Sequence, residues 1–155
     1  MTMATHILAA VDLSDVTPKV IAYARQLAEG WNARLTVLHV VHDLSYYSGV
    51  FITSTPLNTL QHNMETEAKE HLQAWCEDES GSDVMCEPLV LAGRPIAEIA
   101  RLIRELEVDC LVIGAHSMDK AEHQLFGSTA ERLLHHIQCP TVVIPPQPIE
   151  YVTNA

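Results

Sequence analysis

The stretch DCLVIGAHSMDKAEHQLFGSTAERLLHHI, residues 109–137, decides the fold of this chain. It starts with an expected strand at 109–115 that is apolar throughout after Asp109, and it ends with a helical pattern at 128–137. Glycines mark the two junctions, Gly114 and Gly127. An apolar strand without polar alternation is typical of a parallel sheet that is covered on both faces. The stretch therefore predicts a buried strand that is joined to an amphipathic helix through a polar loop.

The same alternation runs through the rest of the chain. Expected strands lie at 6–12, 34–41, 83–92, 109–115 and 141–146, and helical patterns at 17–30, after the loop 43–56, at 95–107 and at 128–137. Pro88 stands inside one expected strand, and because proline has no N–H to donate we expect that strand at a sheet edge. Thr17 is expected to cap the first helix and Gly30 to end it, while Ser128 and Glu131 are spaced as a capping box.

Alternating strands and helices imply right-handed crossovers and a parallel sheet. We therefore expect one doubly wound α/β domain over 1–146, with about five strands, helices on both faces and a C-terminal tail at 147–155. Ligands of such sheets bind beyond the carboxyl ends of the strands, where the strand order reverses. Asp12 ends the first expected strand and Gly114 ends the fourth, so the two share a crevice if those strands are neighbours.

Composition narrows the function classes. The 155 residues carry a formal net charge of -11, which repels nucleic-acid phosphates and anionic lipids. The start of the chain lacks a signal-peptide pattern and no apolar run approaches a membrane span, so we expect a cytoplasmic protein. The four cysteines form no C-x-x-C pair, which favours buried or free thiols over zinc ligands or disulfides.

The glycine-bracketed loop has the chemistry of an anion site. Gly114 lacks a Cβ, so its backbone can approach a ligand closely or adopt a positive φ. Gly127 and Ser128 open the last helix, where free N–H groups and the helix dipole favour negative charge. The Ser128 hydroxyl can cap the helix or donate to a phosphate. The alternative is that both glycines only make tight turns.

The segments ILAAVDLSD, RLTVLHVV, GRPIAEIARLI, VDCLVIGAHS and LFGSTAERLLHHIQCPTVVI together resemble the universal stress protein family over nearly the whole chain. The resemblance implies the strand order 3-2-1-4-5. The nucleotide-binding branch of the family carries the motif G-x2-G-x9-G-(S/T) around ATP phosphates. Gly114, Gly127 and Ser128 match its first and last elements, and Ser117 replaces the middle glycine. Serine adds a Cβ that hinders a positive φ but also a hydroxyl donor.

The resemblance further implies an ATP site, with Mg²⁺ arriving with the nucleotide. Asp12 and the Val11 backbone would lie beside the ribose and adenine, while Ala10 and the Val40 backbone would hold the base. The remaining cofactor-binding positions, around the phosphates and the end of the fourth strand, are Ile113, Gly114, Ser117, Gly127, Ser128 and Thr129. Core packing is the alternative role for Ala10 and Val40, and a loop cap is the alternative role for Asp12.

Signals for catalysis or a resident metal are thin. The chain has no G-x-x-x-x-G-K-(S/T), G-x-S-x-G or H-E-x-x-H motif. Three hypotheses follow: an adenine-nucleotide-binding sensor, a nucleotide-free interaction protein of the same fold, and a slow ATPase. The first is favoured by Gly127 and Ser128, the second by Ser117. The apolar strand at 141–145 is expected to pair with its copy in a homodimer. The alternative is that the C-terminal tail folds back over this edge, and a further protein partner is left open.

Overall fold

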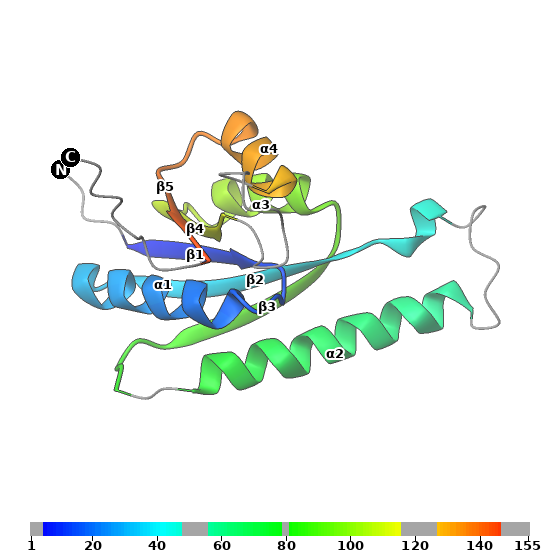
Figure 1. The fold of residues 1–155 in the computed structure, drawn as a ribbon, viewed down its shortest axis with the longest axis horizontal. Coiled ribbons are helices and arrows are strands. Elements are labelled where there is room, and N and C mark those ends of the chain that lie inside the picture. Colours follow the sequence, from blue (N-terminus) through cyan, green and yellow to red (C-terminus); the bar gives the residue numbers. More distant parts are fainter. Residues whose placement is uncertain (1–4, 48–55, 79–80, 116–126, 147–155) are drawn as a thin grey trace, which may run out of the picture.

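The computed structural model describes residues 5–47, 56–78, 81–115 and 127–146. Five parallel strands form one sheet in the order β3-β2-β1-β4-β5, which confirms the expected fold class and strand order (Figure 1). The order reverses between β1 and β4, which are direct neighbours and leave the sheet on the same side. The strands are β1 (His6–Val11), β2 (Arg34–His42), β3 (Cys86–Gly93), β4 (Cys110–Gly114) and β5 (Thr141–Ile144).

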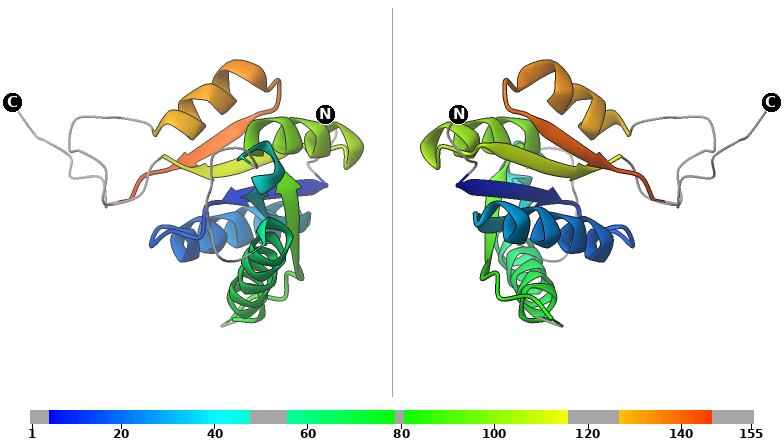
Figure 2. Two further views of the ribbon diagram at one scale, coloured as in Figure 1. Left: turned by 90° about the vertical axis from the view of Figure 1, so that its right-hand side faces the viewer. Right: turned by 90° about the vertical axis from the view of Figure 1, so that its left-hand side faces the viewer.

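Helices cover both faces of the sheet. Figure 2 shows α1 and α2 beneath the sheet and α3 and α4 above it. Each face has its own apolar core, because successive strand residues point to opposite sides: Ile7 packs toward α1 and α2, and Leu8 packs toward α3 and α4. The helical elements are α1 (Thr17–Trp31), the 3-10 turn η1 (Leu44–Tyr47), α2 (Leu57–Glu77), α3 (Pro95–Glu105) and α4 (Ser128–His136).

The two edges of the sheet differ in how they resist further pairing. Pro88 lies in β3, opposite Val37 of β2, and β3 is an edge strand as expected. The missing proline N–H and the exposed Glu87 beside it blunt that edge. At the other edge, β5 pairs with β4 alone among the described strands, and its sequence TVVI carries no charge.

The ends of α1 differ from the sequence expectation. Thr17 is the first helical residue rather than the cap, because the chain already has helical dihedrals at Val16 (φ -83°, ψ -18°). Gly30 lies inside the helix, and Asn32 takes the left-handed conformation at the C-terminus (φ 52°, ψ 42°). Asparagine tolerates that conformation better than most side chains, and its N–H bonds the last carbonyls of the helix.

The start of α4 also differs. Gly127 occupies the N-cap position in an extended conformation (φ -70°, ψ 162°), and Ser128 is the first helical residue. The predicted capping box between Ser128 and Glu131 is therefore wrong, because a box requires its serine at the N-cap. No side chain among the described residues caps this helix.

The amino-terminal side of the sheet is held by one carboxylate. Asp109 Oδ2 accepts the backbone N–H of Thr5 at 2.7 Å and that of His6 at 3.0 Å. These two hydrogen bonds, the Thr5 bond first, lower the pKa of Asp109 below its ordinary value. The contacts tie the start of β1 to the start of β4, away from the strand ends where the site lies.

Candidate functional site

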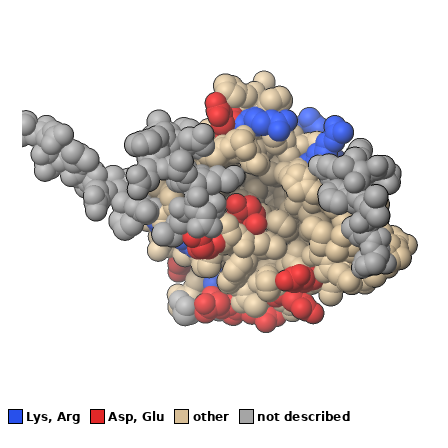
Figure 3. Space-filling model, turned by 45° about the vertical axis from the view of Figure 1, so that its right-hand side comes forward, with Lys and Arg blue, Asp and Glu red and all other residues tan. Residues whose placement is uncertain are grey.

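A cavity of about 530 Å³ opens at the carboxyl ends of β1, β2 and β4. Its floor is formed by strand ends and its sides by the starts of α1, α3 and α4 and by the middle of α2. The space-filling view in Figure 3 shows the surface hollowed near its centre, with acidic side chains beside the hollow and along the lower border of the molecule and Lys or Arg side chains along the upper border. The cavity lies at the switch point that the alternation of strands and helices predicts.

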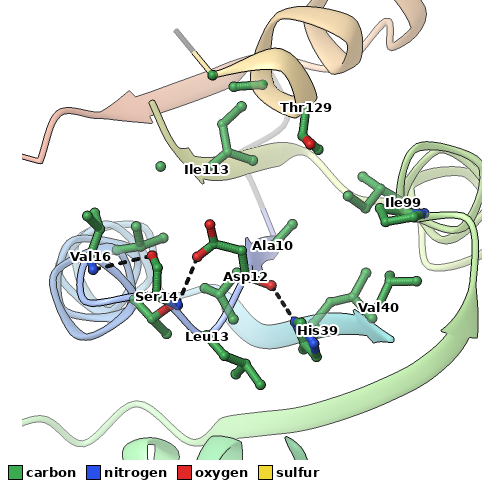
Figure 4. A pocket seen from close by; sticks show the side chains of 18 of the residues that line it. Ala10, Asp12, Leu13, Ser14, Val16, His39, Val40, Ile99, Ile113 and Thr129 are labelled. Carbon is green, nitrogen blue, oxygen red and sulfur yellow. Dashed lines mark hydrogen bonds between the residues drawn. The ribbon is translucent and has the colours of Figure 1, made fainter. Parts of the chain in front are cut away.

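The structure brings together the residues that the sequence singled out. Every predicted site residue within the described part of the chain lines this cavity; Ser117 lies outside the described residues. Figure 4 shows Ile113 and Thr129 on one side of the cavity and Asp12 and His39 across from them. The lining positions that were predicted are Ala10, Val11, Asp12, Val40, Ile113, Gly114, Gly127, Ser128 and Thr129.

Two successive hydrogen bonds from backbone N–H groups to side chains shape the turn between β1 and α1. Asp12 Oδ1 accepts the Ser14 N–H at 3.0 Å, and Ser14 Oγ accepts the Val16 N–H at 3.4 Å (Figure 4). Between them, Leu13 holds a positive φ of 60°, a conformation that is costly for a branched side chain. The turn therefore uses one Asp12 oxygen to shape the loop, as the cap interpretation expected, and aims the carboxyl group at the cavity.

His39 orients the neighbouring backbone. Its Nδ1 lies 2.8 Å from the Val11 carbonyl oxygen. Since a carbonyl only accepts, Nδ1 carries the proton, and in the neutral ring Nε2 is the acceptor. The ring is half-buried at the cavity wall and couples the end of β1 to the end of β2. The family resemblance implied a site role for Val40 and none for His39 beside it.

The two glycines differ in how they shape the cavity, and Gly127 lies at the start of the last helix as expected. Gly114 does not have a positive φ, and a Cβ built on it would lie 3.5 Å from Val20 Cγ2, an ordinary contact. Gly127 donates its N–H to the Ala115 carbonyl at 2.6 Å, which closes the base of the predicted loop. The Gly127 carbonyl accepts the Glu131 N–H at 3.0 Å as the first bond of α4. The N–H groups that follow, from Ser128 onward, are the first-turn donors that face the cavity end of this helix.

One buried hydroxyl at the wall lacks a partner. Thr17 is 1% exposed, it lines the cavity, and its Oγ1 has no hydrogen bond to any described residue. A buried polar atom left in this state costs about 1–3 kcal/mol. Ligand or solvent atoms in the cavity are the natural partners for it.

Residues from α2 and α3 complete the wall, and the sequence did not place them there. Glu67 and His71 come from α2, and Pro95 and Ile99 come from the start of α3. The helical pattern identified the apolar face of each helix, including Ile99, but periodicity does not say how far a helix reaches along the sheet. The long α2 runs beside β3 and past the strand ends, which brings its middle to the cavity (Figure 1).

The charged groups on the described wall are acidic or histidine. Asp12 and Glu67 carry carboxylates, His39, His42 and His71 supply imidazoles, and no lysine or arginine lies among the described lining residues. Within the described ranges, no group of three or more His, Cys, Asp or Glu side chains is arranged to hold a metal ion. None of the described helices has a stretch long and apolar enough to cross a membrane.

Comparison with known proteins identifies the relatives of this fold. The family model described as the universal stress protein family matches residues 3–145. Universal stress protein A homolog 1 of Coxiella burnetii (strain RSA 493 / Nine Mile phase I) is 33% identical over 141 residues, which cover 90% of this chain and 94% of that protein. Universal stress protein UspA from Lactobacillus plantarum superposes with a TM-score of 0.77 at 24% identity, over 93% of this chain and 99% of that chain.

Two further solved structures hold nucleotides. The universal stress protein from Archaeoglobus fulgidus in complex with dAMP has a TM-score of 0.65 at 21% identity, over 92% of this chain and 99% of that chain. A universal stress protein family protein from Arabidopsis thaliana with AMP bound has a TM-score of 0.61 at 16% identity, over 97% of both chains. At 21% and 16% identity, the likeness of these two structures to this chain shows a shared fold and no more. Since the family match runs from the first described strand to the last, this chain belongs to the universal stress protein family.

Proposed function

We propose that this protein binds an adenine nucleotide in the cavity at the carboxyl ends of β1, β2 and β4, and acts as a cytoplasmic sensor or accessory protein of a stress response. One observation carries the proposal: residues chosen from the sequence for a nucleotide site converge on one cavity of suitable size. The nucleotide-bound relatives of the same fold support the choice of ligand.

The wall offers different chemistry to the two ends of a nucleotide. Ala10, Val40 and Ile113 present apolar surface from adjacent strands, which suits the flat face of a base. The start of α4 presents its first-turn N–H groups and the positive end of its dipole, which suit a phosphate. The Asp12 carboxylate lies across the cavity from Ile113 and Thr129, where a ribose hydroxyl can donate to it (Figure 4).

The charge of the wall bears on how many phosphates the site takes. Two carboxylates and no described lysine or arginine line the cavity, on a chain of net charge -11. Backbone N–H groups and a helix dipole supply about half a positive charge. We therefore expect AMP to bind without a metal ion, and ATP to bind with Mg²⁺ that neutralises part of the triphosphate.

Binding rather than turnover is the proposed activity. Phosphoryl transfer relies on lysine or arginine side chains and metal ions around the transferred phosphate. No lysine or arginine lies among the described residues of the wall. The second candidate is a nucleotide-free interaction protein of the same fold. The specific observation in its favour is Ser117 in place of the middle glycine of the family's nucleotide motif.

The test measures the melting temperature with and without AMP, ATP and Mg-ATP, alongside mass spectrometry of any nucleotide carried through purification. A ligand at about 100 times its Kd stabilises by roughly 2.7 kcal/mol, which for a chain of this size raises Tm by about 5–10 °C. Gly127→Val should abolish the rise, because a branched side chain would occupy the space of the phosphate. The dihedrals of Gly127 suit valine, and because the residue is buried, far-UV circular dichroism of the variant checks that it folds.

Gly30→Ala is the matched control. A Cβ on Gly30 meets nothing within 4 Å, and the residue lies in α1 away from the cavity wall, so the nucleotide-dependent rise should persist. Ser117→Gly separates the two candidate functions further: tighter binding would mean that Ser117 hinders the phosphate, and weaker binding that its hydroxyl is a ligand. An unmutated protein that shows no rise with any of the three ligands, and carries no nucleotide, supports the interaction protein instead.

A further inference from the structure

Two of the four cysteines face one another in the core, on the side of the sheet opposite α3 and α4. Cys76 lies near the end of α2 and Cys86 is the first residue of β3, and their Sγ atoms are 2.8 Å apart. Both are reduced in the structure and buried, 4% and 9% exposed. This pairing could not be predicted from the sequence, because the spacing of residues 76 and 86 matches no known cysteine motif.

Packing holds both sulfur atoms in place. On α2, Ala68, Leu72 and Cys76 form one buried stripe, four residues apart, that faces the sheet. The Arg25 guanidinium of α1 donates to the carbonyls of Trp75, Cys76 and Asp78, which anchors the last turn of α2. On the other side, Cys86 is in register with Leu35 of β2. The close approach of the sulfurs is therefore a property of the packed elements.

We propose that Cys76 and Cys86 form a reversible intramolecular disulfide that ties the end of α2 to the edge strand β3. The present Sγ–Sγ separation of 2.8 Å is only about 0.8 Å longer than an S–S bond of about 2.05 Å. A movement of that size lies within the reach of side-chain rotation at the ends of two elements.

The reaction is a two-electron oxidation, with hydrogen peroxide as the oxidant. The thiolate of one cysteine attacks a peroxide oxygen, the O–O bond breaks, and the displaced hydroxide leaves as water after protonation. The thiolate of the second cysteine then attacks the sulfenic sulfur, the S–S bond forms, and a second water leaves. Two thiols and one peroxide thus give one disulfide and two waters. A small dithiol reverses the bond by thiol–disulfide exchange.

Burial sets the rate of the first step. The shared hydrogen bond with Cys86, and then burial, raise the pKa of Cys76 above its ordinary value, so the thiolate is scarce in the closed structure. Oxidation therefore follows local opening, which is easiest at the ends of elements such as these. Once one sulfur is oxidised, the other cysteine of the pair is the nearest thiol. When the end of α2 packs again on the start of β3, the two sulfurs meet and the intramolecular bond is favoured.

Cys110 and Cys139 are internal controls. Their thiols point to backbone carbonyls: Cys110 Sγ lies 3.6 Å from the Leu111 oxygen and Cys139 Sγ lies 3.6 Å from the Val108 oxygen. Cys139 is also less buried than the pair, so peroxide should reach it sooner. The product of oxidation, rather than its speed, therefore distinguishes the two sets of cysteines. We expect an intramolecular disulfide from Cys76 and Cys86, and separately oxidised thiols at Cys110 and Cys139.

The test treats the reduced full-length protein, at dilute concentration, with a small excess of hydrogen peroxide, then alkylates it in denaturant and digests it with trypsin. Cleavage after Lys69 and Arg101 releases a peptide that holds both Cys76 and Cys86 and neither of the other cysteines. The expected peptide is lighter by two hydrogen atoms, carries no alkyl group, and regains two alkylation sites after reduction. The oxidised protein should also melt about 5 °C higher, because the bond constrains the unfolded chain.

Variants fix the assignment. Cys86→Ala should lose both the mass change and the rise in Tm, while Cys110→Ala should keep them. Should Cys86→Ala fold poorly, the mass measurement on the unmutated protein still decides the question. The proposal is wrong if the 70–101 peptide keeps two alkylatable thiols while Cys139 is fully oxidised, or if Cys76 and Cys86 are found bonded only to cysteines of other molecules.

Discussion

Asp12 shows two roles that single substitutions can separate. One carboxylate oxygen shapes the loop by accepting the Ser14 N–H, and the carboxyl group also lines the cavity. Asparagine keeps an oxygen acceptor for Ser14 and loses the charge, whereas alanine loses both. The residue is therefore tested by comparing these two variants rather than by either alone.

For stability, Asp12→Ala should lower the free energy of unfolding by about 1 kcal/mol, the worth of one lost hydrogen bond. Asp12→Asn should stay within about 0.5 kcal/mol of the unmutated protein. Urea denaturation measures both. For binding, Asp12→Asn should weaken adenosine about tenfold if a ribose hydroxyl donates to the charged oxygen. Adenosine is the right probe because it has no phosphate to be repelled by the carboxylate. Equal affinity for adenosine in the two proteins would leave Asp12 with the loop role only.

Asp109 predicts a pH dependence at the opposite side of the sheet. The backbone N–H groups of Thr5 and His6 lower its folded-state pKa below the ordinary 3.8. The carboxylate therefore binds fewer protons in the folded than in the unfolded state, and its contribution is fully present above pH 3.8 and is lost as the pH falls through the lower folded value. The melting temperatures of the unmutated protein and of Asp109→Asn should converge as the pH falls from 5 toward 2. A difference in melting temperature that stays constant over this range would show that the ionised carboxylate adds nothing to stability.

At the scale of elements, packing decides where each helix and strand ends. The 15-residue α1 runs one residue beyond Gly30 and stops at Asn32, whose left-handed conformation closes the helix. At the end of β3, Gly93 has a φ of 158° and lies against the Glu98 side chain of α3. A side chain therefore has room at Gly30 and meets the Glu98 side chain at Gly93.

We predict opposite effects for the two alanine substitutions. Gly30→Ala should raise the free energy of unfolding by about 0.5–1 kcal/mol, since the methyl group meets open space and the unfolded chain loses freedom. Gly93→Ala should lower it, because the new Cβ would lie 2.9 Å from Glu98 Cγ at a φ that suits glycine. Chemical denaturation of both variants checks the pair. A loss of stability in Gly30→Ala would contradict the helical position that the structure assigns to this residue.

At the scale of the whole molecule, the two edges of the sheet differ in charge, and no described strand pairs with the outer side of β5. Pro88 and Glu87 blunt β3, whereas β5 presents an uncharged strand whose Val142 and Val143 are half-buried. An uncharged apolar edge strand is a template for pairing with another chain unless something covers it. A two-fold symmetric antiparallel pairing of residues 141–145 would satisfy the edge N–H groups and cover both valines.

We therefore predict a homodimer through β5. Sedimentation at micromolar protein should give the mass of two chains, and Val143→Lys should shift it to one, because a charge at the centre of the edge opposes pairing. Far-UV circular dichroism of the variant should be unchanged, which separates loss of pairing from loss of fold. If the unmutated protein sediments as a monomer, the predicted dimer is wrong. If the Val143→Lys variant still sediments as a dimer, the interface lies on another surface.

Much of the fold and of the cavity could be read from local patterns. Apolar runs and helical periodicity identified each strand and helix, and the proline in β3 identified an edge, because these signals depend only on neighbours in the chain. The site followed in part by the same means: in a doubly wound sheet the ends of neighbouring strands must meet, so Asp12 at the end of β1 and Gly114 at the end of β4 share a crevice. The other predicted site residues came from the resemblance to the universal stress protein family.

The remaining features depend on contacts that no local pattern encodes. Thr17 and Ser128 have the right chemistry for caps, yet the path of the chain puts Val16 and Gly127 in those positions. Glu67 and His71 reach the cavity because of the length and tilt of α2 over the sheet. The approach of Cys76 to Cys86 requires the end of a helix and the start of a strand to pack together. The sequence by itself determined which elements form and in what order, because periodicity and turn chemistry are local; the tertiary structure alone decided which side chains meet, because that depends on how those elements pack.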